Sequence, residues 1–472
     1  MAAPRTHNKP AALTGRPRVQ TKWVWGKHER RRWAVFGVKF LIFLGLPWLS
    51  LGGYPVLLFD IPARRYHVFG QIFWPQDFYM LGLLLATAAL LLFITTSLIG
   101  RIFCGYACPH TLLTSLFMQI DHWIEGDRPA RLALDGGSAK PAQQARRALK
   151  HAVWLAVSAF FGFTFVSYFV GAHELLGRIT SLSLTGAPLV AWLFITGVTY
   201  LFAGHLRDWV CTTTCPYGRF QGAMQDTDSL IVTYDAVRGE PRGKTKDTIA
   251  RGGCVDCGMC VTACPMGIDI RQGPQYECIT CARCIDACND TMTRIGAPVD
   301  LIRFASENEW QEHVADPQKP LPPLDQHRWW RPRLAWYGVV LTGLLTGLTV
   351  LALNRPLLGI EVNRDRHTAI ATADGRVSNL YNLKLTNKDT RPHTVRLALY
   401  GVDGQLVVGE NPITLEPGAI KPLSASVLLA GVPDRPVPFR FRLLDAVTGE
   451  EKDAINATFV GKLRAPEKGA RS

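Results

Sequence analysis

Eight of the twelve cysteines in this 472-residue chain fall in two runs with the same spacing, C-x2-C-x2-C-x3-C. The first run begins at Cys254 and ends at Cys264, before Pro265, and the second extends from Cys278 to Cys288. This is the bacterial spacing for cubane iron–sulfur clusters, in which the fourth ligand of each cluster comes from the other run. We therefore predict two [4Fe–4S] clusters. The ligands of one would be Cys254, Cys257, Cys260 and Cys288, and those of the other Cys264, Cys278, Cys281 and Cys284.

Structural zinc sites are the alternative for these runs, because C-x2-C pairs also bind zinc. A zinc site needs only four ligands, usually in two separated pairs, whereas two complete quartets repeat here. The spacing therefore favours clusters. Their ligands must be reduced thiolates, so we expect this part of the chain in the reducing cytoplasm.

The other four cysteines form a second repeated motif, C-x3-C-P, at Cys104–Pro109 and Cys211–Pro216. Proline is favoured at the first position of a helix, so we expect Cys108 and Cys215 at helix N-termini, where the helix dipole favours the thiolate. Four thiolates brought together would suit Cu(I), zinc or a further cluster.

These four cysteines could also be inert small residues at helix ends, but their repetition favours metal or redox work. We predict a catalytic role for Cys104, Cys108, Cys211 and Cys215, and copper is a candidate for the metal ion that they bind. Nearby His110, His122 and His205 are additional candidate ligands, although each alone is more typical of an ordinary histidine at a helix end.

Five apolar stretches must position these motifs. The length of each stretch is close to the roughly 20 helical residues that are needed to cross a bilayer. They are residues 34–51, 80–99, 152–170, 187–204 and 334–353. The first stretch fits a membrane span least well because it contains the charged residue Lys39. A buried soluble helix bundle is the alternative, but the length and near absence of charge of the second and fifth stretches disfavour it.

The basic residues indicate the orientation of these spans. Residues 1–33 carry nine Lys or Arg against one acid, and the 100–151 loop is also basic. The positive-inside rule then places 1–33, 100–151 and 205–333 in the cytoplasm, and five spans send 354–472 to the periplasm of the bacterial inner membrane. The net charge of +14 is therefore an orientation signal, and we expect no nucleic-acid partner.

The C-terminal part changes to a period of two, with alternation at Tyr381–Leu385, Val395–Leu399 and Phe439–Leu443. Turn signals at Asp374-Gly375, Asp403-Gly404 and Pro417-Gly418 separate such runs, which predicts antiparallel strands over 360–463. That length and strand density are typical of an immunoglobulin-like β-sandwich.

The predicted fold is therefore a multi-domain integral membrane protein. A basic tail (1–33) precedes four transmembrane helices within 34–204, and a cytoplasmic segment (205–333) contains a bacterial-type 2[4Fe–4S] ferredoxin domain at about 245–300. A fifth helix (334–353) and a periplasmic immunoglobulin-like domain in 354–472 complete the chain.

Several further blocks accompany the cysteine motifs, and together they resemble a known family. They are Phe73–Tyr79, Phe103–Pro109, Trp123–Asp127, Arg219–Gln221, Leu230–Asp235, Arg238–Gly243 and Asp374–Asn379. With these blocks the chain resembles the cytochrome c oxidase accessory proteins CcoG, also called FixG or RdxA. Thr212–Thr214, His110 and Asn289 depart from the pattern that we expect, without removing a ligand.

The resemblance implies a membrane-bound oxidoreductase that reduces Cu(II) to Cu(I) for the copper centre of cbb3-type cytochrome c oxidase. The ferredoxin cysteines would carry electrons, and the C-x3-C-P cysteines would handle copper. The implied partners are copper ions, oxidase assembly factors or a copper chaperone or transporter, and an unidentified electron donor. The apolar stretches add the lipid bilayer, and a homodimer is a further possible assembly.

Two other functions stay open at this point. The chain could be an electron-transfer ferredoxin subunit of a quinol-linked respiratory chain that never meets copper. It could also be a non-catalytic oxidase assembly scaffold, with the β-domain as the docking element.

Overall fold

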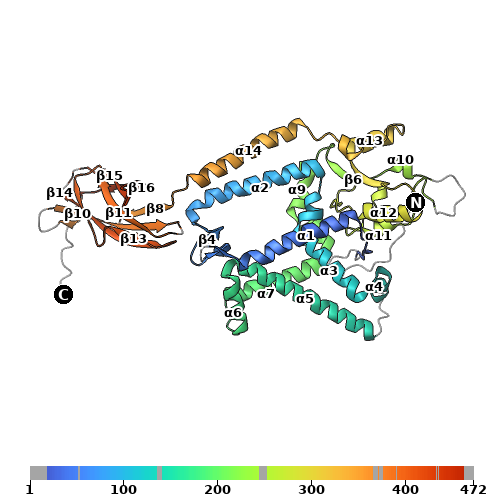
Figure 1. Ribbon diagram of the computed structural model, residues 1–472, viewed down its shortest axis with the longest axis horizontal. Helices are drawn as coiled ribbons and strands as arrows, with labels where there is room; N and C mark the ends of the chain where they lie inside the picture. Colours follow the sequence, from blue (N-terminus) through green and yellow to red (C-terminus); the bar gives the residue numbers. More distant parts are fainter. Residues whose placement is uncertain are drawn as a thin grey trace, which may run out of the picture. The chain divides into compact units, whose positions relative to one another are not determined.

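The computed structural model describes residues 19–51, 54–135, 141–243, 252–364, 370–371, 376–389, 391–431, 433 and 435–461. The chain divides into two compact units (Figure 1). One unit comprises residues 1–48 and 82–347, and the other comprises residues 49–81 and 348–472. The start of the basic tail and the expected Asp374-Gly375 turn lie outside the described residues.

Among the described residues, four helices are long and apolar enough to cross a membrane: α2 (Phe78–Ile99), α5 (Pro141–Val170), α7 (Ala187–Gly204) and α14 (Pro332–Leu353). They coincide with four of the five predicted stretches, although α5 begins well before residue 152 because the helix continues through the polar sequence that precedes the apolar one. Helices α2 and α14 run side by side, with the rings of Phe93 and Tyr337 in contact (Figure 1). Much of their apolar surface is exposed, which suits a lipid environment.

The first predicted stretch, 34–51, is not one helix. Helix α1 covers Lys27–Gly45 and is followed by the 3-10 turn η1 (Leu46–Trp48) and the short strand β1 (Ser50–Leu51). The helix begins early because the carboxylate of Asp286 accepts hydrogen bonds from the backbone N–H groups of His28 and Glu29. This cap comes from a residue far away in sequence, so apolar periodicity alone placed the helix start wrongly.

The predicted 100–151 loop is largely helical. It contains a π-helical turn η3 (Phe103–Ala107), α3 (Pro109–Glu125), α4 (Arg128–Asp135) and the first residues of α5. Helix α6 (Ala172–Thr180) connects α5 to α7.

The segment between α7 and α14 holds the ferredoxin-type cysteine runs. Strand β6 (Leu230–Tyr234) pairs antiparallel with β7 (Ile302–Ser306), and the cysteine runs lie between them in sequence, together with α11 (Met259–Ala263) and α12 (Arg283–Arg294). A small buried core with Val232, Ile285 and Leu301 supports both runs. The other elements are α8 (Arg207–Trp209), the π-helical turn η4 (Val210–Thr214), α9 (Pro216–Met224), α10 (Ala236–Gly239), η5 (Ile270–Gln272), α13 (Glu307–Ala315) and η6 (Leu324–Gln326).

The second unit contains a two-sheet sandwich. One sheet has the order β12-β14-β10-β8, with β9 beside β10, and the other has the order β13-β11-β15-β16. Alternate residues of β10 are buried, among them Tyr381 and Leu383, as the period of two predicts. The strands are β8 (Leu358–Arg364), β9 (Ile370–Ala371), β10 (Arg376–Asn387), β11 (His393–Tyr400), β12 (Gly404–Val408), β13 (Ile413–Leu415), β14 (Ile420–Ala430), β15 (Val437–Asp445) and β16 (Glu451–Phe459).

Residues 49–81 belong to this second unit and form a small sheet that the sequence analysis did not predict. Its strands β3 (Leu57–Asp60), β4 (Arg65–Val68) and β5 (Gln71–Phe73) pair in chain order. The buried Asp77 carboxylate joins this segment to the sandwich by accepting from Arg355 at 2.7 Å and from Lys388 at 3.0 Å.

Candidate cluster and thiol sites

The two ferredoxin-type runs fold into loops with the same backbone pattern. The residues directly before and after the second cysteine of each run have left-handed φ angles: Asp256 (51°) and Gly258 (66°) in the first run, Thr280 (53°) and Ala282 (59°) in the second. Such angles are unfavourable for Thr and Ala, and they persist only where the surroundings enforce them. A loop that must wrap its thiols around an inorganic core gives a physical reason for this shared geometry.

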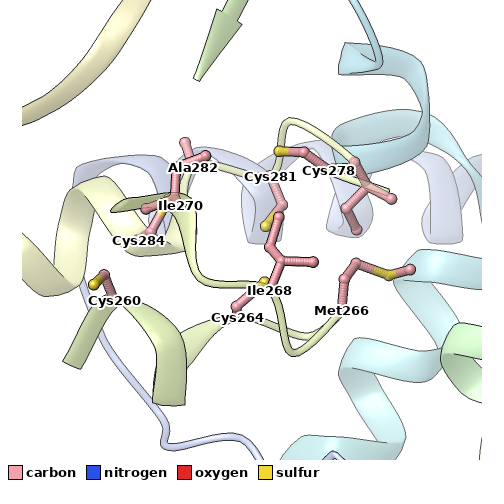
Figure 2. Close-up of a pocket in the computed structure, with 10 residues that line it drawn as sticks. Cys260, Cys264, Met266, Ile268, Ile270, Cys278, Cys281, Ala282 and Cys284 are labelled. Atoms are coloured by element: carbon pink, nitrogen blue, oxygen red, sulfur yellow. The ribbon is translucent and has the colours of Figure 1, made fainter. Parts of the chain in front are cut away.

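The structure brings the fourth cysteine of each run to the other run. The Cys288 thiol lies within electrostatic range of Cys254, Cys257 and Cys260. In the same way, the Cys264 thiol lies near Cys278 and Cys281, and these three surround Cys284. The two groups are adjacent, because Cys260 lines the same cavity as the cysteines of the second group (Figure 2). These are the neighbours that the crossed spacing predicts.

This first cavity encloses an empty volume of about 350 Å³, including its open side, and is otherwise lined by apolar groups such as Ile268 and Ile270. Burial raises the pKa of the Cys260, Cys264 and Cys278 thiols to about 12. Closely spaced buried thiolates therefore need positive charge among them, which iron ions supply. The donor set, the enclosed space and the loop geometry all fit iron–sulfur clusters.

The C-x3-C-P motifs share one local structure. In each, a π-helical turn ends at the second cysteine, whose backbone N–H donates to the carbonyl five residues back: Cys108 to Phe103 and Cys215 to Val210, both at 2.8 Å. Pro109 then opens α3 and Pro216 opens α9, so both cysteines are helix N-caps, as the sequence analysis expected. Single π turns inside helical segments are frequent at functional sites.

The structure also brings these four cysteines together. Cys104 lies within electrostatic range of Cys108, Cys211 and Cys215. Burial, reinforced by the neighbouring thiols, raises the pKa of Cys104 and of Cys211 to about 12. The Cys104 and Cys211 thiols are therefore protonated at neutral pH in the absence of a cation, and a bound metal ion would displace those protons.

The three candidate histidines differ in their surroundings. His110 lines a second cavity together with Cys211, and its Nε2 lies 3.0 Å from the Arg207 carbonyl oxygen. His122 instead pairs with Asp127 at 3.2 Å, and the His205 ring stacks on His151. His110 therefore lines the same cavity as a thiol.

The two cysteine sites touch at Gly105, the residue after Cys104. A Cβ atom added at Gly105 would lie 2.7 Å from the Ile279 carbonyl oxygen and 3.0 Å from the Cys281 backbone nitrogen. Only a residue without a side chain allows this approach. The C-x3-C-P site is therefore packed directly against the second ferredoxin-type loop.

The first turns of α1 and the residues just before it contact both sites, whereas the basic residues of this region predicted only the membrane orientation. The buried Glu29 carboxylate pairs with Arg32 at 2.6 Å and with Arg283 at 2.7 Å, and Arg32 Nε donates to the Gly105 carbonyl at 2.9 Å. The Arg283 guanidinium also lies 4.9 Å from the Trp23 ring centroid. The sequence feature that could have indicated this role of Glu29 is that it is the single acid among nine basic residues in 1–33.

The pairing controls the protonation of Glu29. Burial opposes ionisation of this carboxyl, but the charges and hydrogen bonds of Arg283 and Arg32 outweigh burial and lower its pKa to about 2. Glu29 is thus a charged, buried link between α1 and the helix that carries Cys284 and Cys288.

Apolar helices, a ferredoxin-type module with paired cysteine quartets and an immunoglobulin-like sandwich define a membrane-associated iron–sulfur oxidoreductase of the electron-transfer class. Residues 206–307 match the 4Fe-4S dicluster domain, residues 81–129 match a 4Fe-4S binding domain, and residues 348–462 match the Ig-like fold at the C-terminal of FixG.

The chain belongs to the FixG/RdxA family. It is 40% identical over 412 residues to protein RdxA of Cereibacter sphaeroides, with 85% of this chain and 84% of that protein covered. It is 37% identical over 461 residues to the nitrogen fixation protein FixG of Rhizobium meliloti, with 88% and 87% covered. Protein RdxB of Cereibacter sphaeroides is 35% identical over 398 residues, with 82% and 83% covered.

Proposed function

We propose that this protein is a cupric reductase of the bacterial inner membrane, which supplies Cu(I) for assembly of the copper centre of cbb3-type cytochrome c oxidase. The observation that carries the proposal is the gathering of Cys104, Cys108, Cys211 and Cys215 into one group, packed through Gly105 against the Cys281 loop. Soft thiolate ligands prefer Cu(I), so this group favours the reduced product.

The arrangement supports a direction for electron flow. Cys257 is exposed, whereas the other members of its quartet, Cys254, Cys260 and Cys288, are buried. An electron donor could approach at Cys257, and the second quartet leads on to Gly105 and the C-x3-C-P thiols. Bound [4Fe–4S] clusters supply single electrons, at potentials that span about −700 to +450 mV.

The proposed reaction at the C-x3-C-P thiols is a one-electron reduction of copper. Each Cu(II) ion takes one electron and becomes Cu(I), and no atom is transferred. The thiols hold the ion and give up protons as they bind it, because burial keeps Cys104 and Cys211 protonated beforehand.

We further propose that the ferredoxin module is cytoplasmic and the second unit periplasmic. Asp77 binds Arg355 and Lys388, so residues 49–81 and the sandwich share one side of the membrane. Trp23 and Glu29 contact Arg283 of the ferredoxin module, which precedes the apolar helix α14 in sequence, whereas the sandwich follows it. With α14 as a membrane span, this proposal requires a further crossing between Glu29 and residue 49, and it assigns that crossing to α1. A membrane-impermeant maleimide applied to whole cells should label an Ala63→Cys variant and spare a Glu312→Cys variant; the opposite pattern would reverse the topology.

The proposed recipients of Cu(I) are oxidase assembly factors or a copper chaperone or transporter, and a homodimer is the proposed assembly. The electron-carrier function remains the second candidate, because the exposed Cys257 suits docking of a redox partner. The C-x3-C-P cysteines separate the two candidates, since an electron carrier has no need of a soft-metal site.

A test replaces Cys104 and Cys215 by Ser together, with Thr214→Ser, an exposed position in the same motif, as the matched control. The double variant should retain its cluster spectra and lose at least 90% of its Cu(II) reduction, while the control keeps both. Unchanged reduction in the double variant would remove copper handling from these cysteines.

A further inference from the structure

A second cavity lies between the C-x3-C-P site and the ferredoxin-type loops. Its empty volume is about 290 Å³, including its open side. Cys211 of one C-x3-C-P motif and His110, directly after the other motif, line one part of it. Ile279 of the second cysteine run and Pro265 and Met266, directly after the first run, line another part. The cavity therefore borders both groups of thiols.

Two methionines line this cavity. The chain has seven methionines in all, and Met118 of α3 and Met266, two residues after the first cysteine run, lie far apart in sequence. Met266 also lines the first cavity, and in Figure 2 its side chain extends toward the neighbouring helical segment. The Met118 sulfur is buried and accepts a hydrogen bond from Thr21 Oγ1 at 3.4 Å, which leaves its second lone pair for another partner.

The other lining groups favour a cation over an anion. The Arg207 guanidinium is already neutralised by Asp121 at 2.8 Å, and the carboxylate-bearing residue Asp208 also lines the cavity. The Thr111 side chain is 6% exposed, and its hydroxyl has no hydrogen-bond partner within the described part of the chain. This leaves an unsatisfied buried hydroxyl beside two thioethers, a thiol and an imidazole.

Packing is the simpler role for a methionine, because its flexible side chain fills irregular gaps. Here, however, both thioethers border an open cavity that also holds Cys211 and His110. Thioether, thiol and imidazole ligands together select soft metal ions, and among biological ions Cu(I) fits this donor set best.

We propose that this cavity is a Cu(I) binding site in which the sulfur atoms of Met118 and Met266 are ligands, with Cys211 shared with the thiol group. The inference rests on the proposed function, because it assigns the place that receives the reduced ion as it leaves the four cysteines. Thioethers need no deprotonation to bind or release copper, so they suit a site of transfer rather than storage.

The test uses the full-length protein labelled with selenomethionine and loaded anaerobically with one equivalent of Cu(I). Selenium-edge X-ray absorption should detect a copper–selenium contact in the wild-type protein and in a Met259→Leu control. Met259 does not line the cavity, and its sulfur accepts a hydrogen bond from Lys22. The Met118→Leu, Met266→Leu double variant should lose the contact, and its affinity for Cu(I) against a chromogenic chelator should fall at least tenfold. Leucine preserves the side-chain volume, and cluster absorbance reports on folding.

Absence of a copper–selenium contact in the wild-type protein, or its persistence in the double variant, would overturn the site. The experiment measures Cu(I) binding without any Cu(II) reduction, so the binding site and the proposed function can fail independently. A contact that is lost in the double variant supports the site even if the protein fails to reduce Cu(II), whereas active reduction without the contact removes the site alone.

Discussion

At the scale of single residues, the contact at Gly105 decides how closely the two cysteine sites approach. The neighbours of a Cβ atom there are the backbone atoms of Ile279 and Cys281, which cannot swing aside as a flexible side chain would. The separation between thiol groups therefore depends on the absence of one methyl group.

Gly105→Ala should push the C-x3-C-P motif away from the Cys281 loop and slow Cu(II) reduction at least tenfold while both clusters assemble. Overpacking of this kind also costs roughly 1–3 kcal/mol in stability. Stopped-flow oxidation of the prereduced protein by Cu(II) measures the rate. Gly197→Ala is the matched control, because an added Cβ atom at Gly197 meets no atom within 4 Å. Equal rates in the two variants would show that the Gly105 contact is unimportant for electron transfer.

The candidate residues differ in how far the sequence could reveal them. The crossed neighbours of Cys264 and Cys288 follow from spacing, because ligand reach is a local property of the loop. Met118 and Met266 could not be associated, since each is an ordinary apolar residue until tertiary folding brings both to one cavity. The Cys104 and Cys215 motifs were visible as a repeat, but not their closeness in space.

At the scale of elements, α1 links the membrane part to the ferredoxin module. Its first turn is capped by Asp286 and its Glu29 pairs with Arg283, both on α12. Breaking a buried ion pair by neutralising one partner costs about 3–5 kcal/mol, because the other charge is left buried alone.

Glu29→Gln should therefore destabilise the ferredoxin module by about 3–5 kcal/mol at pH 7. Glu312→Gln, which removes the exposed pair with Lys319, should leave the stability nearly unchanged because solvent screens that pair. Thermal loss of the cluster absorbance compares the variants. Because the folded-state pKa of Glu29 is lowered to about 2, its contribution is complete above the ordinary pKa of 4.5 and is lost as the pH falls toward 2. Similar thermal midpoints for the two variants would contradict this role.

The long apolar helices α2, α5, α7 and α14 were predictable because a run of about 20 apolar residues favours a helix that is long enough to cross a bilayer. The start of α1 was not predictable, because a hydrogen bond from a residue far away in sequence fixes it. The π turns η3 and η4 were also not predictable, although the proline after each second cysteine marks where the turn ends. The small sheet β3-β4-β5 was missed because its strands are short and carry no clear alternation.

At the scale of the whole molecule, the second unit combines two segments that are far apart in sequence. Asp77 is the buried acid between Arg355 and Lys388, and the Arg355 guanidinium also lies 4.2 Å from the Phe73 ring centroid. The chain order gave no sign of this pairing, although the predicted topology had placed both segments on the same side of the membrane.

Asp77→Asn should leave the buried Arg355 and the half-buried Lys388 without this counter-ion and release residues 49–81 from the sandwich, at a cost of about 3–5 kcal/mol. Hydrogen–deuterium exchange should then rise in β3, β4 and β5. Glu410→Gln is the control, because Glu410 pairs with Lys421 on the exposed surface of the same unit. Unchanged protection of β3–β5 in the Asp77 variant would argue against this attachment.

The central claim, that electrons held at the ferredoxin cysteines reach copper, is tested most directly by an anaerobic titration. The purified protein is fully reduced and separated from the reductant, Cu(II) is added, and cluster bleaching and Cu(I) formation are followed together. We predict one Cu(I) per electron lost from the clusters, with little reaction in a Cys281→Ser variant. Clusters that stay reduced while copper stays Cu(II) would contradict the account and favour an electron carrier with a protein partner.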